Sequence, residues 1–274
     1  MVGEKIAIVS ACPQTTRNLI RGIVTFDEAQ IIFVDTPGIT ELSKVKTLLD
    51  RQIIRETLKG LKGTDLILFL VDGTPFSQED DFILKNLEQL KKPVFLVINK
   101  VDQLKEFQWK VLSEEYLSHF PFSRVIPVSA KKQTNLSILA GEMIQQLPVH
   151  PPYYPSDLIT DSPERILIAE FIREKIFLFT RQEIPYSSLV KIQQFEERKN
   201  HLMYIRAAIY VEHSSQRGIL VGKSGSMIKK IGEEARREIE THLGCKIYLD
   251  LWVGVKKDWR MRQKSFREIG PQMD

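Results

Sequence analysis

The stretch Phe95-Leu-Val-Ile-Asn-Lys-Val-Asp102 begins as a short apolar run typical of a buried strand and stops abruptly at Asn99-Lys100-Val101-Asp102. A carboxylate at the end of such a strand can accept two hydrogen bonds from the N1–H and N2 amine of guanine, whereas adenine presents the opposite donor and acceptor pattern. Asp102 would therefore select guanine, while Asn99 and the stem of Lys100 brace the loop against the nucleotide. An ordinary polar turn after a strand is the alternative for these four residues taken alone.

Length and composition set the broad class of the protein. A chain of 274 residues is long enough for two domains with sizeable cores. Two cysteines cannot build a disulfide framework, which favours a reducing cytosol. The first residues lack the pattern of a signal peptide, and the longest apolar run, Leu66 to Val71, is too short to span a bilayer, so we expect a soluble, unsecreted protein.

Charge is distributed unevenly along the chain. Residues 1–150 hold 18 basic and 18 acidic side chains, and the remainder hold 21 basic and 17 acidic ones, so the whole net charge of +4 lies after residue 150. An excess of positive charge confined to one part of a chain is a weak indication of a polyanionic partner there.

A second polar cluster follows a strand in the first half. Residues 5–9 and 18–25 are expected to be extended, with a polar stretch between them, and Ala29 to Val34 reads as a strand that ends at Asp35-Thr-Pro-Gly38. A carboxylate at a strand end can hold Mg²⁺ through water, and a following glycine can bring its N–H against a phosphate. Asp-x-x-Gly is also a common turn.

The rest of the first half alternates helices with strands. Helices are expected over 45–61, 77–91, 105–119 and 135–147, and strands over 65–71 and 124–128 besides the one that ends at Asn99. This alternation predicts a mostly parallel α/β sheet. Asp35, Asn99 and Ser129 would stand at the carboxyl ends of its strands, where ligands bind in such sheets.

The order Thr15-Thr16-Arg17, Asp35-Thr-Pro-Gly38, Asn99-Lys-Val-Asp102 and Ser129-Ala-Lys131, each after a strand, resembles the translation-factor-related GTPases. The resemblance implies that Thr16 completes the Mg²⁺ shell, that Asp35 contacts Mg²⁺ through water, and that Gly38 senses the γ-phosphate. The Ala130 N–H would contact the guanine carbonyl. Ile39 stands where many GTPases carry a water-orienting glutamine, so any hydrolysis should be slow or assisted by backbone or a partner, and no catalytic residue is assigned. The implied nucleotide-binding residues are Thr16, Asp35, Gly38, Asn99, Lys100, Asp102, Ser129, Ala130 and Lys131, with Thr16 and Asp35 on the metal.

One expected motif is missing. Gly-x-x-x-x-Gly-Lys-Ser/Thr, the loop that cradles phosphates, does not occur before Asp35, and Gly218 to Ser224 has only three residues between its glycines and follows every other nucleotide motif. The absent strand would lie between the Asp35 and Asp65 strands. Burial of such a strand would stabilise the domain by ~1.5–3 kcal/mol for each of several side chains. The sum is comparable with the whole stability of a domain, which is ~5–15 kcal/mol. We therefore expect either that the true start lies upstream or that folding and nucleotide binding of this half are compromised.

The second half has the order of a different domain. The proline-rich linker Leu147 to Pro155 is followed by a helix opened by Pro163, strands near 187–197 and 203–213, a short helix, Gly222-Lys-Ser-Gly225, a helix over 226–243 and a strand over 246–255. This is the arrangement of a bacterial-type KH domain, whose Gly-x-x-Gly loop clamps single-stranded nucleic acid. A glycine-capped joint between helices with solvated lysines is the alternative. The candidate RNA-binding residues are Gly222, Lys223, Ser224, Gly225, Lys229 and Lys230.

The whole chain resembles the bacterial Era family of GTPases, through the motifs above and through Gln14-Thr-Thr-Arg17, Ile159-Thr-Asp161, Ile172-Arg-Glu-Lys175, Pro185-Tyr186 and Leu251-Trp-Val253. It implies an α/β GTPase domain of the P-loop NTPase type at 1–150, lacking its first strand and P-loop, and an α+β type II KH domain at 151–274. Ala11-Cys12-Pro13 departs from the lysine-containing stretch expected in the first switch.

The resemblance also implies a function. The expected protein is a cytoplasmic, monomeric ribosome-assembly factor that uses GTP/GDP and Mg²⁺ and binds the 3′ end of small-subunit (16S) ribosomal RNA on the 30S subunit. It would also associate peripherally with the inner membrane. The alternative is a nucleotide-independent KH RNA-binding protein on a degenerate GTPase scaffold.

Overall fold

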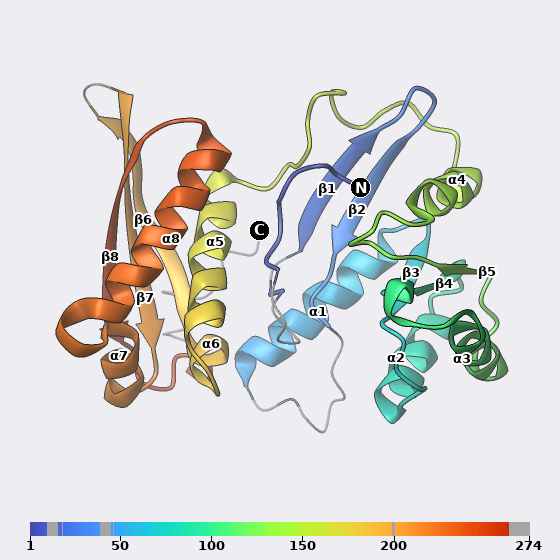
Figure 1. Ribbon diagram of the computed structural model, residues 1–274, viewed down its shortest axis with the longest axis horizontal. Coiled ribbons are helices and arrows are strands. Elements are labelled where there is room, and N and C mark those ends of the chain that lie inside the picture. The colour runs from blue at the N-terminus through green and yellow to red at the C-terminus, as the bar shows by residue number, and fades with distance from the viewer. Residues whose placement is uncertain (10–15, 18, 39–44, 46, 199–200, 263–274) are drawn as a thin grey trace.

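The structure is a computed structural model that describes residues 1–274 except 10–15, 18, 39–44, 46, 199–200 and 263–274. Two lobes lie side by side, with helices α1 and α5 flanking the space between them (Figure 1). The first lobe contains, in chain order, β1 (Ile20–Thr25), β2 (Gln30–Asp35), α1 (Leu48–Lys62), β3 (Ile67–Val71), α2 (Gln78–Glu88), β4 (Val94–Ile98), α3 (Glu106–His119), β5 (Arg124–Pro127) and α4 (Leu136–Gln146).

A parallel sheet in the order β3-β4-β5 forms the centre of the first lobe, as the alternation of elements predicts. Every residue of β4 is buried, because α2 and α3 pack on one face of the sheet and α4 packs on the other. Helix α2 begins at the predicted cap, where Ser77 and Asp80 form a reciprocal capping box. The sheet thus holds the segment that ends at Asn99 rigidly from both sides.

Strands β1 and β2 pair with each other in antiparallel fashion and form a separate two-stranded sheet. Between β2 and β3 lies a cavity of about 1600 Å³, lined by residues of both strands, including Ile32, Val34 and Leu68. A neighbouring strand is expected at this place from the sequence. Among the described residues, neither β2 nor β3 has a strand partner on the side that faces the cavity.

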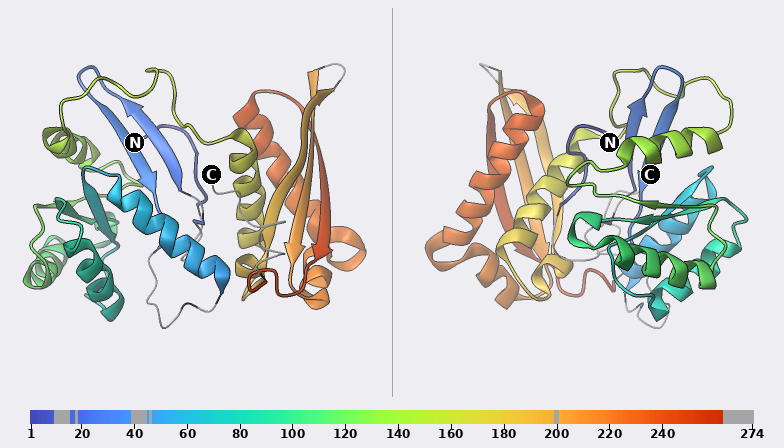
Figure 2. Two further views of the ribbon diagram at one scale, coloured as in Figure 1. Left: turned by 180° about the vertical axis from the view of Figure 1, so that it is seen from behind. Right: turned by 45° about the vertical axis from the view of Figure 1, so that its right-hand side comes forward.

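The second lobe has the element order predicted for a KH domain. It contains α5 (Glu164–Phe179), α6 (Ile184–Ser187), β6 (Leu189–Arg198), β7 (Leu202–Val211), α7 (Ser214–Val221), α8 (Ser226–Leu243) and β8 (Ile247–Val255). The sheet order is β6-β7-β8, with β6 antiparallel and β8 parallel to β7. Helices α5 and α8 cover one face of this sheet (Figure 2). On the other face, Leu189 and Tyr210 pack with Trp259 and with Leu49 and Ile53 of α1.

Some details differ from the expectations. Residues 5–9 join no strand, because Lys5 Nζ and the Val9 N–H both bond the Glu174 carboxylate of α5, at 2.7 and 2.9 Å, in place of a β partner. The strand predicted from 187 begins at Leu189, since Ile184–Ser187 forms the short helix α6. Strand β7 ends at Val211 because the N–H groups of the next two residues bond the Gln216 side chain and open α7. Among the described helices, none has the length and apolar character needed to cross a membrane.

Candidate functional site

The side chain of Asn99 joins the two loops predicted to bind guanine. Its Oδ1 accepts hydrogen bonds from the N–H of Lys100 at 2.8 Å and from the N–H of Ala130 at 3.0 Å. Lys100 takes a left-handed backbone conformation with φ of 62°, which turns the chain sharply away from the strand. The loop after β4 and the loop after β5 are therefore fixed relative to each other by one amide.

Asp102 is held in the same network. Ser129 Oγ donates to Asp102 Oδ1 at 2.6 Å and accepts the Lys132 N–H at 3.1 Å. The hydrogen bond from Ser129 lowers the pKa of the Asp102 carboxyl, with a smaller contribution from the charge of Lys131. Since Asp102 is exposed and ionised at neutral pH, it is an acceptor-only group aimed from a fixed loop, which is what guanine recognition requires.

Asp72 was not predicted, and it belongs to this site. It follows β3, whose last residue pairs in register with Ile98 of β4, and its carboxylate lies 2.9 Å from Lys100 Nζ. The parallel register of two neighbouring strands brings their carboxyl ends together, so the sequence did contain a signal for this contact. The ion pair holds the Lys100 ammonium against the end of β3.

The predicted magnesium ligands lie together. Thr16 Oγ1 donates to Asp35 Oδ2 at 3.1 Å, and desolvation raises the pKa of the Asp35 carboxyl in spite of that bond. A hydroxyl and a carboxylate are the hard oxygen ligands that Mg²⁺ takes, and Asp35 is open to solvent at the end of β2, so the pair fits the ion. Among the described residues, no group of three or more histidine, cysteine, aspartate or glutamate side chains is arranged to hold a metal ion. The remaining ligands would come from water and phosphate.

The candidate nucleotide residues fall around two hollows. Asp35, Asn99 and Ala130 line the large cavity between β2 and β3. Thr16 and Gly38 line a neighbouring one of about 270 Å³. Asp102, Ser129 and Lys131 lie beside the large cavity and are not part of its lining. The prediction on Ile39, and those on 11–13 and 14–15, fall outside the residues that the structure describes.

Arg17, named in the sequence but given no role, connects the lobes. Its guanidinium is buried and donates to the carbonyl oxygens of Ser188 at 2.7 Å, Tyr186 at 2.5 Å and Pro185 at 3.4 Å. Burial, and next the charge of Arg173, lowers the pKa of Arg17 to about 9, so it remains cationic at neutral pH. Arg17, which follows the predicted Mg²⁺ ligand Thr16, is thus fixed to α6 of the second lobe.

The Gly-x-x-Gly segment has the backbone that its glycines predict. Gly222 has φ of 73° and Gly225 has φ of 81°, and a Cβ on Gly222 would lie 2.8 Å from the Met227 N. Only glycine fits such a position without displacing the start of α8. Lys223 and Ser224 are exposed between the two glycines.

The basic side chains predicted to contact RNA lie on α8 beyond this loop. Lys229 and Lys230 are both exposed, and Lys230 Nζ lies 4.2 Å from the centre of the Phe179 ring.

Gly218, the first glycine of the rejected phosphate-loop match, lies inside α7. A helix carrying it cannot wrap a phosphate, so that rejection is confirmed.

Known families match both lobes of the chain. The KH domain model matches residues 183–260, and a model described as 50S ribosome-binding GTPase matches residues 1–100. GTPase Era of Halothermothrix orenii is 44% identical over 271 residues, covering 98% of this chain and 91% of that protein. GTPase Era of Carboxydothermus hydrogenoformans is 43% identical over 272 residues, with 98% and 90% covered.

Two solved structures resemble the whole chain. Aquifex aeolicus Era bound to GDP.AlF4- gives a TM-score of 0.92, and Era in complex with MgGDPNP and nucleotides 1506-1542 of 16S ribosomal RNA gives 0.93. Each is 37% identical in sequence to this chain, and each comparison covers 98% of this chain and 91% of the other. The arrangement of α/β lobe and KH lobe therefore agrees with these structures over both parts.

Proposed function

Because this chain belongs to the Era family of GTPases, we propose that it is a GTP-binding factor of small-subunit assembly whose KH domain binds the 3′ region of 16S ribosomal RNA. We divide the chain into a GTPase domain at 1–150 and a KH domain at 151–274. Slow hydrolysis of GTP would switch the factor between states. The cytoplasm, with peripheral association at the inner membrane, is the proposed location, and a monomer the proposed form.

The observation that carries this proposal is the hydrogen-bond network of the guanine loop. Asn99 fixes the Ala130 N–H, and Ser129 fixes the Asp102 carboxylate, so both groups that would read guanine are oriented before any nucleotide binds. Preorganised polar groups cost little to order on binding, and a base lacking the matching pattern leaves them unpaired. We propose that Lys100 and Lys131 flank the base, that Thr16 and Asp35 hold Mg²⁺, and that Gly38 contacts the terminal phosphate.

Thermal unfolding with nucleotide tests the GTP site. A ligand at 100 times its Kd adds ~2.7 kcal/mol to the free energy of unfolding, so Mg²⁺-GTP should raise the melting temperature while Mg²⁺-ATP at the same concentration should not. Equal responses to the two nucleotides would contradict guanine selection. No response to either would remove the nucleotide part of the proposal and leave the RNA part standing.

RNA binding is tested at the Gly-x-x-Gly loop. Gly222→Asp combined with Gly225→Asp places two carboxylates where phosphates would approach, and it should abolish binding of an RNA equivalent to nucleotides 1506–1542 of 16S ribosomal RNA. A matched pair, Gly218→Asp with Gly141→Asp, adds the same charge at sites where a Cβ meets no atom within 4 Å. Gly225→Asp alone adds a carboxylate to the loop without the contact that a Cβ on Gly222 would make with the Met227 N, and it should also weaken binding. Loss of binding in the second pair as well would point to net charge and contradict a role for the loop.

The gap between β2 and β3 favours a second candidate function. Among the described residues, a cavity of about 1600 Å³ lies between β2 and β3, and neither strand has a strand partner on that side. A nucleotide-independent RNA-binding protein would not need this part of the first lobe to hold a nucleotide. The two functions are separated by measuring RNA affinity with and without Mg²⁺-GTP, since a switch must change that affinity and an independent binder must not.

A further inference from the structure

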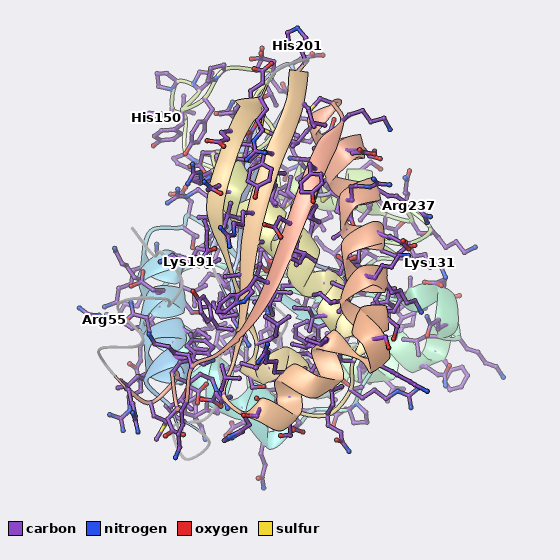
Figure 3. All side chains as sticks on the ribbon, turned by 90° about the vertical axis from the view of Figure 1, so that its left-hand side faces the viewer. Arg55, Lys131, His150, Lys191, His201 and Arg237 are labelled. Carbon is purple, nitrogen blue, oxygen red and sulfur yellow. The ribbon has the colours of Figure 1, made fainter. Side chains whose placement is uncertain are left out.

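The face of the KH sheet opposite α5 and α8 carries a row of aromatic rings. In Figure 3 the three strands stand in front, with this face toward the viewer, and α8 lies to one side. We define the aromatic platform as Tyr204 and Arg206 of β7 with Tyr248 and Trp252 of β8. Strand β8 is the last in the sheet, because β7 is its only strand partner among the described residues.

Three side chains stack across the strands toward that edge. The Arg198 guanidinium lies 3.4 Å from the centre of the Tyr204 ring, and Tyr204 stacks on Tyr248 with centroids 5.7 Å apart and planes inclined by 11°. Tyr204 is 8% exposed, whereas Tyr248 is 59% exposed. The column therefore ends in an open ring at the position where the next strand would place another side chain.

Trp252 offers a second open ring on the same face. Its indole is 47% exposed and lies over Gly254, where an added Cβ would meet the ring at 2.4 Å. Tyr210 contacts it edge-on, with centroids 5.9 Å apart at 81°. Gly254 and Tyr210 thus restrict the orientation of the indole, and little side-chain entropy remains to be lost when a ligand stacks on it.

A charged pair lies between the two rings. Tyr248 and Trp252 are four residues apart on one strand, hence ~13 Å apart, and Asp250 is midway between them. Arg206 of β7 pairs in register with Asp250, and its Nε lies 3.5 Å from the Asp250 carboxylate, which also accepts the Tyr204 hydroxyl at 3.1 Å. Rings separated by an exposed charged pair do not form the continuous apolar centre of a protein interface, since those centres are depleted of charge. Open rings with a guanidinium on the neighbouring strand are groups that can take bases and a phosphate of a single strand.

From this arrangement we propose that the aromatic platform is a second RNA-contacting surface, on which two bases of a single strand stack on Tyr248 and Trp252 while Arg206 faces the backbone between them. Helices α7 and α8, which bear the Gly-x-x-Gly loop, both contact β8. A strand clamped at the loop can therefore continue around the edge of β8 onto the platform. The inference rests on the proposed RNA binding by the KH domain and extends its footprint.

The test measures affinity of the full chain for the RNA equivalent to nucleotides 1506–1542, by fluorescence anisotropy. Tyr248→Ala and Trp252→Ala should each weaken binding about 5- to 150-fold, the range for removing one stacked base. Tyr248→Phe and Trp252→Phe should restore it, because they keep the ring. Arg206→Gln should lower the slope of log affinity against log salt by about one. Phe107→Ala, an equally exposed ring on α3 that is 61% accessible, is the matched control and should bind like the unaltered protein.

The outcomes separate this inference from the function on which it rests. Unchanged affinity in both alanine variants, with binding lost in the Gly222→Asp, Gly225→Asp protein, would overturn the platform and leave the loop in place. An unaltered protein that does not bind the RNA overturns both. Sedimentation velocity of the same variants tests whether a second copy of the chain, and not RNA, occupies this face. A dimer that becomes monomeric on Trp252→Ala, with RNA affinity unchanged, would assign this face to a second copy of the chain.

Discussion

Arg17→Ala should loosen the junction between the two lobes, and its effect can be worked from the contacts. Hydrogen bonds to a charged group contribute ~1.5–3 kcal/mol each, but desolvation of the buried guanidinium offsets much of that gain, as its lowered pKa of about 9 shows. Removing the side chain leaves the Ser188 and Tyr186 carbonyls without their closest donor, at ~1–3 kcal/mol apiece. We expect a net loss of about 2–4 kcal/mol from the stability of the junction.

The chain supplies both a control and a reporter for this measurement. Arg21 also bonds the second half of the chain, through Asp161 at 2.8 Å, but its side chain is 50% exposed, so Arg21→Ala should cost about 1 kcal/mol or less. Trp259 is fully buried at the junction, and its Nε1 donates to the Ser187 carbonyl at 3.0 Å. Its emission in urea, with Trp109→Phe and Trp252→Phe as background, follows opening of the junction.

The reasoning is refuted if Arg17→Ala shifts the Trp259 transition no more than Arg21→Ala does. Such a result would mean that solvent or rearranged carbonyls compensate fully for the guanidinium. Arg17→Lys adds a graded case, because an ammonium keeps the charge but lacks the planar set of donors that three carbonyls require. It should lie between the alanine variant and the unaltered protein.

Three further predictions concern the proposed sites. Asp102→Asn should shift thermal protection from GTP toward xanthosine triphosphate, whose added carbonyl needs a donor where guanine has an amine, and continued preference for GTP would contradict direct base reading. Asp35→Asn should stabilise the metal-free protein at pH 7. Desolvation raises the pKa of Asp35, so ionisation of this carboxyl lowers stability as the pH rises from the ordinary aspartate pKa to the raised one. The variant's advantage over Asp27→Asn, a change in the turn between β1 and β2, should therefore vanish below the ordinary aspartate pKa. Lys223→Ala should reduce RNA affinity and lower its salt slope by about one, and an unchanged slope would exclude a phosphate contact.

Much of the fold followed from local patterns that a single sequence contains. The buried apolar run before Asn99 and the carboxyl ends of parallel strands sufficed to place Asn99 and Ser129 at one end of the parallel sheet. Asp35 instead ends β2, which pairs with β1 in a separate antiparallel sheet. The positive φ values of Gly222 and Gly225 likewise follow from residue type, since glycine alone occupies them without strain. Element boundaries were less predictable where a side chain competes for backbone groups, as Glu174 does for the N–H of Val9.

The contacts that the sequence could not predict share a physical reason. Arg17 bonds backbone carbonyls about 170 residues away, and a carbonyl belongs to every residue type, so its partner leaves no mark in the sequence. The Tyr204–Tyr248 stack depends on the register of β7 against β8, and a shift of one strand by one residue would break it by turning the ring of that strand to the covered face. Local chemistry therefore predicts a loop that would read a base, whereas the surfaces that join the lobes or would extend a binding face are set by register and packing. Variants of the exposed rings Tyr248 and Trp252 therefore test whether the open face of the KH sheet binds RNA, and variants of the buried Arg17 guanidinium test whether it joins the two lobes.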